Sequence, residues 1–253
     1  KHLIEDHYEQ QLRLKTTELR FLQSQINPHF LYNTLDSIYW MAKNYDAEEI
    51  SEMVMNLSSF FRLSLNKGRQ EFTVEESIAH LNYYLRIQQL RFMDNFQVEY
   101  RISEQSKRIP LLKLLLQPIV ENAIIHGMEG KEADGYLVIS SWVEQDHTLH
   151  IRVEDNGPGI EEERLRYIQQ ELDRMDLRKI VAYSQDEEQV KDLFGLRNVL
   201  SRMKLYYGPE ARLIVQSAPG EGTTVTLSIP LKEDQDESDD RGGRAPAAAS
   251  ASL

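Results

Sequence analysis

The chain has 253 residues, a formal net charge of −12 and no cysteine. The negative charge argues against nucleic acid as a general partner, and the lack of cysteine excludes disulfides and thiolate metal sites. No apolar run reaches the roughly 20 residues that a membrane-spanning helix needs, and no signal peptide is visible. Because the chain begins at Lys1, inside helical sequence, we expect it to be part of a longer protein.

The first 26 residues or so predict a charged helix without Gly or Pro. Leu12, Leu19 and Ile26 recur every seven residues, and Leu22 fills the intermediate heptad position between the last two. The earlier intermediate positions hold Tyr and Lys, so the apolar seam is imperfect. A parallel coiled coil and a solvated amphipathic helix both fit this pattern.

A helix break is predicted at the Asn27-Pro28 step, because proline lacks a backbone donor and biases the preceding residue away from the helical region. Pro28 should lie in the first turn of the next helix, which presents His29 at the break. Asn33 lies four residues on and shares the face of His29, whereas a separate apolar stripe consists of Leu31, Leu35, Ile38 and Ala42. A neutral imidazole in this setting is a plausible nucleophile, although most lone histidines are surface or capping residues.

Two amphipathic helices follow, over about 29–44 and 47–66. Their short connection makes them antiparallel neighbours, and a dimer would complete a four-helix bundle, because two helices alone cannot close a core. Thr73, with Glu76 three residues later, predicts a capped helix that continues to about Phe92, with Leu81, Leu85 and Phe92 facing inward.

From Phe96 onward, strands and helices alternate. Helices are expected over 110–127 and 195–207, and Pro118 should kink the first or give it a tight start. Helices over one face of a mixed, mostly antiparallel sheet make an α+β sandwich. The acidic and Gly/Ala/Ser/Pro-rich end cannot bury a core, and we expect it to be disordered. The expected strands are 96–102, 136–143, 149–153, 212–216 and 223–230.

Two stretches of this second half carry candidate chemistry. Asn122 and His126 share one helix face, and an amide oxygen suits Mg²⁺, although the pair alone could be an ordinary polar face. Asp155 ends a strand and is followed by Gly157 and Gly159 around a proline. Such a turn lets the backbone approach a flat ligand, and the carboxylate could accept from an amine such as that of adenine. An ordinary tight turn is the alternative.

A third group of residues is rich in glycine. Gly195 opens the predicted last helix, where free N–H groups and the helix dipole favour phosphate, and Arg197 and Asn198 follow it. Before the last strand lie Gly220, Gly222 and Thr223. Each of these motifs is weak alone.

In this order, the motifs resemble the N, G1, G2 and G3 boxes of the Bergerat ATP-binding fold. With Gln-Ile-Asn-Pro-His-Phe-Leu-Tyr-Asn-Thr-Leu upstream, the chain resembles sensor histidine kinases of the LytS/YesM type, and the resemblance covers about Leu19 to Leu231. It implies a helical hairpin that forms a dimeric four-helix bundle, followed by an α/β sandwich of the Bergerat (GHKL) fold. The implied parts are a signalling helix (1–27), dimerisation and phosphotransfer helices (28–70), a linker helix (71–95), a catalytic ATP-binding domain (96–232) and a disordered tail (233–253).

The resemblance also implies a function. His29 would be the phosphoacceptor, with Asn33 orienting its ring, and Asn122 would hold Mg²⁺ beside ATP. The phosphoryl group would pass to an aspartate of a response regulator. The protein would be a homodimer and the cytoplasmic portion of a bacterial plasma-membrane sensor, held to the membrane through the missing upstream segment. The other ATP-binding residues implied are His126, Asp155, Gly157, Gly159, Gly195, Arg197, Asn198, Gly220, Gly222 and Thr223.

The sequence departs from the family pattern in two places. Leu193 stands where the G2 box often has its first glycine, and Phe30, not an acidic residue, follows His29. The stretch from about 161 to 194 would be the ATP lid. A same-fold ATPase that hydrolyses ATP is one alternative, but Pro118 occupies the position of its water-activating Glu. A catalytically degenerate dimeric scaffold is the other, supported only by Leu193.

Overall fold

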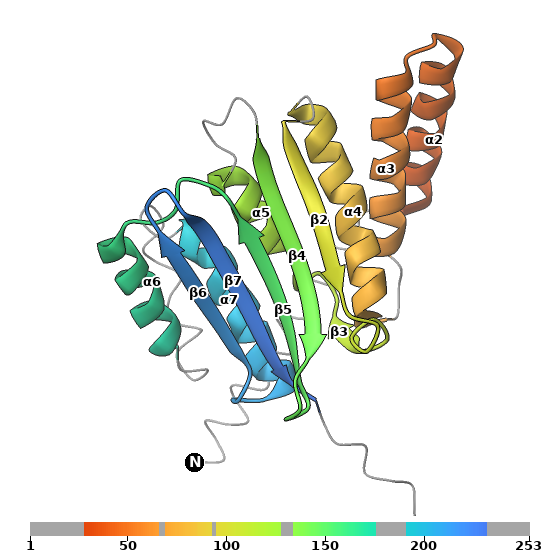
Figure 1. The fold of residues 1–253 in the computed structure, drawn as a ribbon. Coiled ribbons are helices and arrows are strands. Elements are labelled where there is room, and N and C mark those ends of the chain that lie inside the picture. Colours follow the sequence, from red (N-terminus) through yellow and green to blue (C-terminus); the bar gives the residue numbers. More distant parts are fainter. Residues whose placement is uncertain (1–27, 66–68, 93–94, 128–133, 176–190, 232–253) are drawn as a thin grey trace, which may run out of the picture.

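The computed structural model describes residues 28–65, 69–92, 95–127, 134–175 and 191–231. The predicted signalling helix, the middle of the predicted lid and the predicted tail lie outside the described residues. Figure 1 shows a helical hairpin on one flank, helix α4 between the hairpin and a central sheet, and helix α6 on the opposite flank. Within the described ranges, no helix combines the length and apolar character needed to cross a bilayer.

The hairpin consists of α2 (Pro28–Asn44) and α3 (Glu48–Ser64), which pack against each other as the short connection predicts. Leu35 and Ala42 of the predicted apolar stripe are buried, but Ile38 is 41% exposed, so the packing stripe is only partly covered. The hairpin also exposes apolar side chains elsewhere: Phe30, Trp40, Met41, Tyr45, Ile50 and Met55.

Helix α4 (Val74–Arg91) follows the short strand β1 (Glu71–Thr73), and its predicted cap is confirmed. The Thr73 hydroxyl accepts from the Glu76 amide at 3.1 Å, and the Glu76 carboxylate accepts from the Thr73 amide at 2.8 Å. A capping box of this kind contributes about 1 kcal/mol. Leu81 and Leu85 are buried as predicted, whereas Phe92 is 37% exposed and was wrongly placed inward.

The five-stranded sheet has the order β2-β4-β5-β7-β6, with β2 and β4 parallel and every other pair antiparallel. The inward residues of its strands share one apolar core with α5 (Gln117–Gly127), α6 (Glu162–Asp173), α7 (Lys191–Tyr207) and the leucines of α4. The predicted α+β architecture is confirmed. The boundary at residue 95/96 stays a prediction, and the core continues across it. The strands are β2 (Phe96–Ile102), β4 (Gly135–Val143), β5 (Thr148–Asp155), β6 (Arg212–Ala218) and β7 (Gly222–Pro230).

Helix α5 begins at Gln117, so Pro118 lies in its first turn, where no helical donor is needed. Of the two outcomes predicted at Pro118, the helix therefore starts there and is not kinked. Residues 110–112, predicted as helix, instead form strand β3 (Pro110–Leu112), which pairs with β1. These six residues are too few and too weakly patterned for sequence periodicity to identify them as a sheet.

The turn between β3 and α5 is held by the C-terminal half of α7. The Arg202 guanidinium donates to the carbonyls of Lys113 and, at 3.2 Å, Leu114. The Leu112 amide donates to the Tyr207 hydroxyl at 2.6 Å. Burial raises the pKa of Tyr207 to about 12, so the phenol stays neutral at physiological pH. These contacts fix the direction in which α5 leaves the turn.

Candidate functional site

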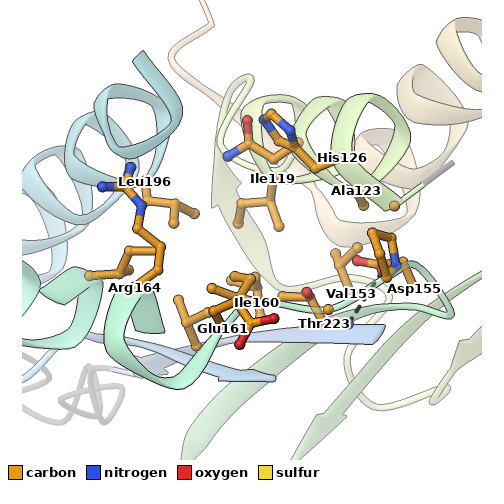
Figure 2. A pocket seen from close by; sticks show the side chains of 17 residues that line it. Ile119, Ala123, His126, Val153, Asp155, Ile160, Glu161, Arg164, Leu196 and Thr223 are labelled. Atoms are coloured by element: carbon orange, nitrogen blue, oxygen red, sulfur yellow. Dashed lines mark hydrogen bonds between the residues drawn. The ribbon is translucent and has the colours of Figure 1, made fainter. Parts of the chain in front are cut away.

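A cavity of about 390 Å³ opens between α5 on one side and α6 and α7 on the other, above β5 and β7 (Figure 2). This size suits a small-molecule ligand. Five of the residues predicted to bind ATP line it, although they come from three separate segments of the chain. They are Asn122, His126, Asp155, Gly159 and Thr223.

Asp155 is the last residue of β5 and stands opposite Thr223 in the register of β5 and β7. Its Oδ1 accepts from the amide of Gly157 at 2.9 Å and from the amide of Thr223 at 3.3 Å. The two backbone donors fix the orientation of this carboxylate in the cavity wall. A carboxylate held in this way can accept a hydrogen bond from a ligand amine.

Three glycines allow backbone segments to meet at Asp155. A Cβ added to Gly157 would lie 2.7 Å from its Oδ1, and one added to Gly127 would lie 2.8 Å from its Cγ. Gly222 has φ +85°, and a Cβ there would overlap the backbone carbonyl of Asp155. Gly157 and Gly222 are not among the cavity-lining residues, so contact with the protein rather than with a ligand explains them.

Ser217, which the sequence did not single out, ties this end of the cavity together. Its hydroxyl donates to the carbonyl of Gly222 at 2.6 Å and accepts from the amide of Ile160 at 2.9 Å. Because its one proton is used, the Thr223 hydroxyl must donate in the 3.0 Å contact between the two side chains. Ser217 thus joins the turn after β5 to the start of β7. Nothing in its sequence neighbourhood distinguishes it from other strand serines.

One wall of the cavity is the face of α5 that carries Asn122 and His126, together with the apolar Ile119 and Ala123. Glu121 does not line the cavity and accepts instead from the Gln117 side chain at 2.7 Å. No group of three or more His, Asp or Glu side chains able to hold a metal occurs in the described part of the chain. The Asn122 amide therefore fits a Mg²⁺ ion that takes its remaining ligands from phosphates and water, and does not fit an all-protein cage.

The predicted G2 residues are placed differently from expectation. Helix α7 already includes Lys191, so Gly195 lies inside the helix, and its amide is not one of the free N-terminal donors. Gly195 is packed near Asn122, because a Cβ added to Gly195 would lie 3.6 Å from the side-chain nitrogen of Asn122. Arg197 donates to Glu171 of α6 at 2.7 Å. Of this group of residues, Leu196 lines the cavity, whereas Gly195, Arg197, Asn198 and the later Gly220 do not. Leu193 is buried in the core, which explains this departure from glycine.

Helix α6 adds lining residues that sequence patterns did not predict. Arg164 and Ile168 line the cavity from this helix, preceded by Glu161 and Ile160. Figure 2 shows Arg164 and Leu196 on the side of the cavity away from Asp155. The segment after residue 160 is charged and weakly periodic in sequence, so no pattern marked these positions.

His29 lies on α2 and is not part of the cavity. The Asn33 side-chain nitrogen lies 3.1 Å from His29 Nδ1. With this amide orientation Nδ1 is the acceptor, whereas the flipped amide would accept from an Nδ1–H and leave the lone pair on Nε2. The catalytic roles of both residues remain predictions.

His29 and the cavity lie toward opposite ends of α4. The Tyr32 hydroxyl donates to the Phe61 carbonyl at 3.4 Å, and the neighbouring Phe60 ring lies 4.4 Å from that of His80, near the start of α4. Asp155 instead lies near the C-terminal end of α4. β2 begins after that end, and Asp155 lies level with the start of β2, two strands away in the sheet. The 18 residues of α4 span roughly 27 Å.

Comparison with known proteins matches each half of the chain to a family, and both families agree with the resemblance seen in the sequence. Residues 17–96 match the histidine kinase family, and residues 107–233 match the histidine kinase-, DNA gyrase B- and HSP90-like ATPase family. Sensor histidine kinase YesM of Bacillus subtilis (strain 168) is 34% identical over 92% of this chain and 36% of the relative. Sensor protein LytS of Bacillus anthracis is 32% identical over 88% and 36%.

A third relative, the putative uncharacterized protein YwpD of Bacillus subtilis (strain 168), is 35% identical over 85% of this chain and 71% of its own length. The chain thus spans about a third of the YesM and LytS relatives. The two matched families, in this order and joined to the motifs described above, show that the chain belongs to the sensor histidine kinases of two-component systems, of the LytS/YesM type.

Proposed function

We propose that this chain is an ATP-dependent protein-histidine kinase that phosphorylates His29 and passes the phosphoryl group to an aspartate of a response regulator. The observation that carries the proposal is the joint presence of two arrangements in one chain. Asn122, His126, Asp155 and Thr223 converge on one cavity, and an exposed His29 stands within hydrogen-bond distance of Asn33 on a separate helix.

The cavity suits a nucleotide whose base amine donates to Asp155. The apolar Ile119 and Ala123 would pack against the base, and Asn122 would hold Mg²⁺, which neutralises charge on the phosphates when bound. His126, one turn farther along α5, would approach the phosphates. Catalysis then depends mainly on positioning and electrostatics.

At His29, the lone pair of a ring nitrogen forms the bond to the γ-phosphorus as the bond from that phosphorus to the ADP oxygen breaks. ADP leaves with the electron pair, and the surplus ring proton passes to water. If the Asn33 amide is flipped so that its oxygen accepts from Nδ1–H, it orients the ring and leaves the lone pair on Nε2, the nitrogen that would face the phosphate. Glu121 is turned toward Gln117, away from the cavity, which favours transfer to His29 over water activation.

A homodimer is part of this proposal. Large apolar side chains on α2 and α3 remain exposed in a single chain, and Trp40 is 65% and Met41 59% exposed. A second hairpin would cover such side chains and complete a four-helix bundle. We also propose attachment to a bacterial plasma membrane, with this portion in the cytoplasm.

The test is phosphate incorporation from γ-labelled Mg-ATP by the wild type, His29→Gln and the control His147→Asn in an exposed turn. We expect acid-labile, alkali-stable label in the wild type and the control, and at least about 100-fold less in His29→Gln. Undiminished label in His29→Gln would exclude this acceptor. Bound ATP without label would point to the scaffold, and released phosphate without label to the ATPase. Failure to bind ATP would remove the proposed role of the cavity.

A further inference from the structure

Arg164 of α6 is the only Lys or Arg among the described residues that line the cavity. Its side chain is half-buried, and its guanidinium lies 5.3 Å from the centroid of the Tyr167 ring, one turn farther along the helix. No motif places a cation here. Sequence patterns pointed instead to Arg197 as the arginine near the nucleotide.

The position of Arg164 is unfavourable for α6 itself. It is the third residue of a helix that begins at Glu162, where the helix dipole favours acidic side chains and disfavours a cation. The surrounding lining is apolar, with Ile160, Ile168 and Leu196 close by. A residue that breaks a local rule of helix stability and lines a cavity is a candidate for ligand binding.

The charges around the cavity indicate which part of a ligand Arg164 would contact. The other fixed charges in the lining are the carboxylates of Asp155 and Glu161, which would repel a polyphosphate. Arg197 does not line the cavity and is held by Glu171 at 2.7 Å, with both side chains mostly buried. Figure 2 places Arg164 across the cavity from Asp155, so a ligand whose amine meets Asp155 directs its other end toward Arg164.

We propose that Arg164 binds the phosphate groups of the nucleotide, as the cation that offsets their charge on the α6 side of the cavity. A guanidinium can donate two parallel hydrogen bonds to phosphate oxygens, which fixes orientation as well as charge. In the kinase reaction Arg164 places the phosphate chain between α5 and α6. This inference rests on the proposed nucleotide site.

The experiment compares the affinities of Mg-ATP and adenosine for the wild type and for Arg164→Gln by isothermal titration calorimetry. Arg166→Gln is the matched control, because Arg166 lies on the same helix, is about two-thirds exposed and bonds Glu162. We expect Arg164→Gln to weaken Mg-ATP binding about 10- to 100-fold, as loss of a charged hydrogen-bond donor does, and to change adenosine binding less than about twofold. Arg164→Lys should recover part of the loss.

Several outcomes would overturn the assignment. If Mg-ATP binds Arg164→Gln as tightly as wild type, or if adenosine and Mg-ATP weaken equally, Arg164 does not act on the phosphates. An equal loss in Arg166→Gln would have the same meaning. The melting temperatures of the ligand-free variants identify a folding defect, and Arg164→Lys then decides the question. A wild type that binds neither ligand removes the proposed nucleotide site itself, which is a distinguishable result.

Discussion

At the scale of single residues, the site depends on how closely the backbone approaches Asp155. Its carboxylate is held by the amides of Gly157 and Thr223, and the glycines around it leave no room for a side chain. In this chain, glycine at 157 and 222 is therefore explained by contacts within the protein. The position of Asp155, the residue that would recognise the ligand, therefore depends on these contacts.

Gly222 and Gly220 offer a matched pair of substitutions. Both have positive φ, +85° and +80°, so alanine at either position carries a similar backbone cost of about 1 kcal/mol. Only at Gly222 does the new Cβ meet the Asp155 carbonyl, whereas nothing lies within 4 Å at Gly220. We expect Gly222→Ala to weaken Mg-ATP binding at least about tenfold and Gly220→Ala to change it less than threefold, as measured by calorimetry. Equal losses would mean that the close approach to Asp155 does not matter for binding.

Residue types and their order could predict which segments form the site, but not every side chain in it. Asp155, Asn122 and Thr223 stand in motifs whose chemistry is visible in sequence. Arg164 enters through the packing of α6 against the sheet, and Ser217 through the pairing of β6 with β7, and no local pattern records either. The sequence predicts that the last helix opens at Gly195, whereas α7 already includes Lys191.

At the scale of elements, the contact between α3 and α4 centres on His80. This residue is 2% exposed, lies between the rings of Phe60 and Phe72, and its Nε2 is 2.7 Å from Ser64 Oγ. Because the Ser64 hydroxyl donates to the Phe60 carbonyl, the imidazole is the donor to Ser64. Sequence periodicity predicted both helices but not this histidine as the residue that joins them.

His80 makes stability depend on pH. Burial, together with the charge of Lys113, lowers its pKa from 6.5 to about 4. Below pH 6.5 the unfolded chain takes up a proton that the folded chain binds only near pH 4, so the free energy of unfolding falls as pH falls through this range. We expect a loss of about 1–2 kcal/mol between pH 7.5 and 5.

Urea unfolding of the wild type and His80→Phe at several pH values measures this loss. The phenylalanine ring introduced at position 80 can pack with Phe60 and Phe72 and cannot titrate. The variant should therefore lose clearly less stability than the wild type between pH 7.5 and 5. Lowered pKa values of Glu52 and Glu76 place their own losses below their ordinary value of 4.5, outside this window. Equal pH dependence in both proteins would show that another group titrates.

At the scale of the whole molecule, the hairpin is fastened to α4 at two points. The His80 cluster holds one end, and farther along α4 the Arg86 guanidinium forms a two-pronged ion pair with Glu52 at 2.5 and 3.1 Å. This docked arrangement keeps the first turn of α2, which carries His29, near the start of α4, and His29 does not line the cavity. Figure 1 shows the hairpin and α6 on opposite flanks of the sheet. If the proposed transfer to His29 occurs within one chain, the hairpin must leave this position.

Release of the hairpin from α4 should therefore raise the rate of His29 labelling, provided that the proposed kinase activity holds. The Glu52–Arg86 pair is about one-third exposed, so it contributes at most about 1 kcal/mol, which corresponds to about a fivefold change in population. Glu52→Gln should raise the initial labelling rate at saturating Mg-ATP about two- to fivefold without changing the KM for ATP, because Glu52 does not line the cavity. Glu104→Gln, which removes an ion pair with Lys107 in an exposed turn, is the control and should leave the rate unchanged. A rate that is unchanged or lower in Glu52→Gln, with ATP affinity intact, would mean that docking against α4 does not limit delivery of His29 to the nucleotide.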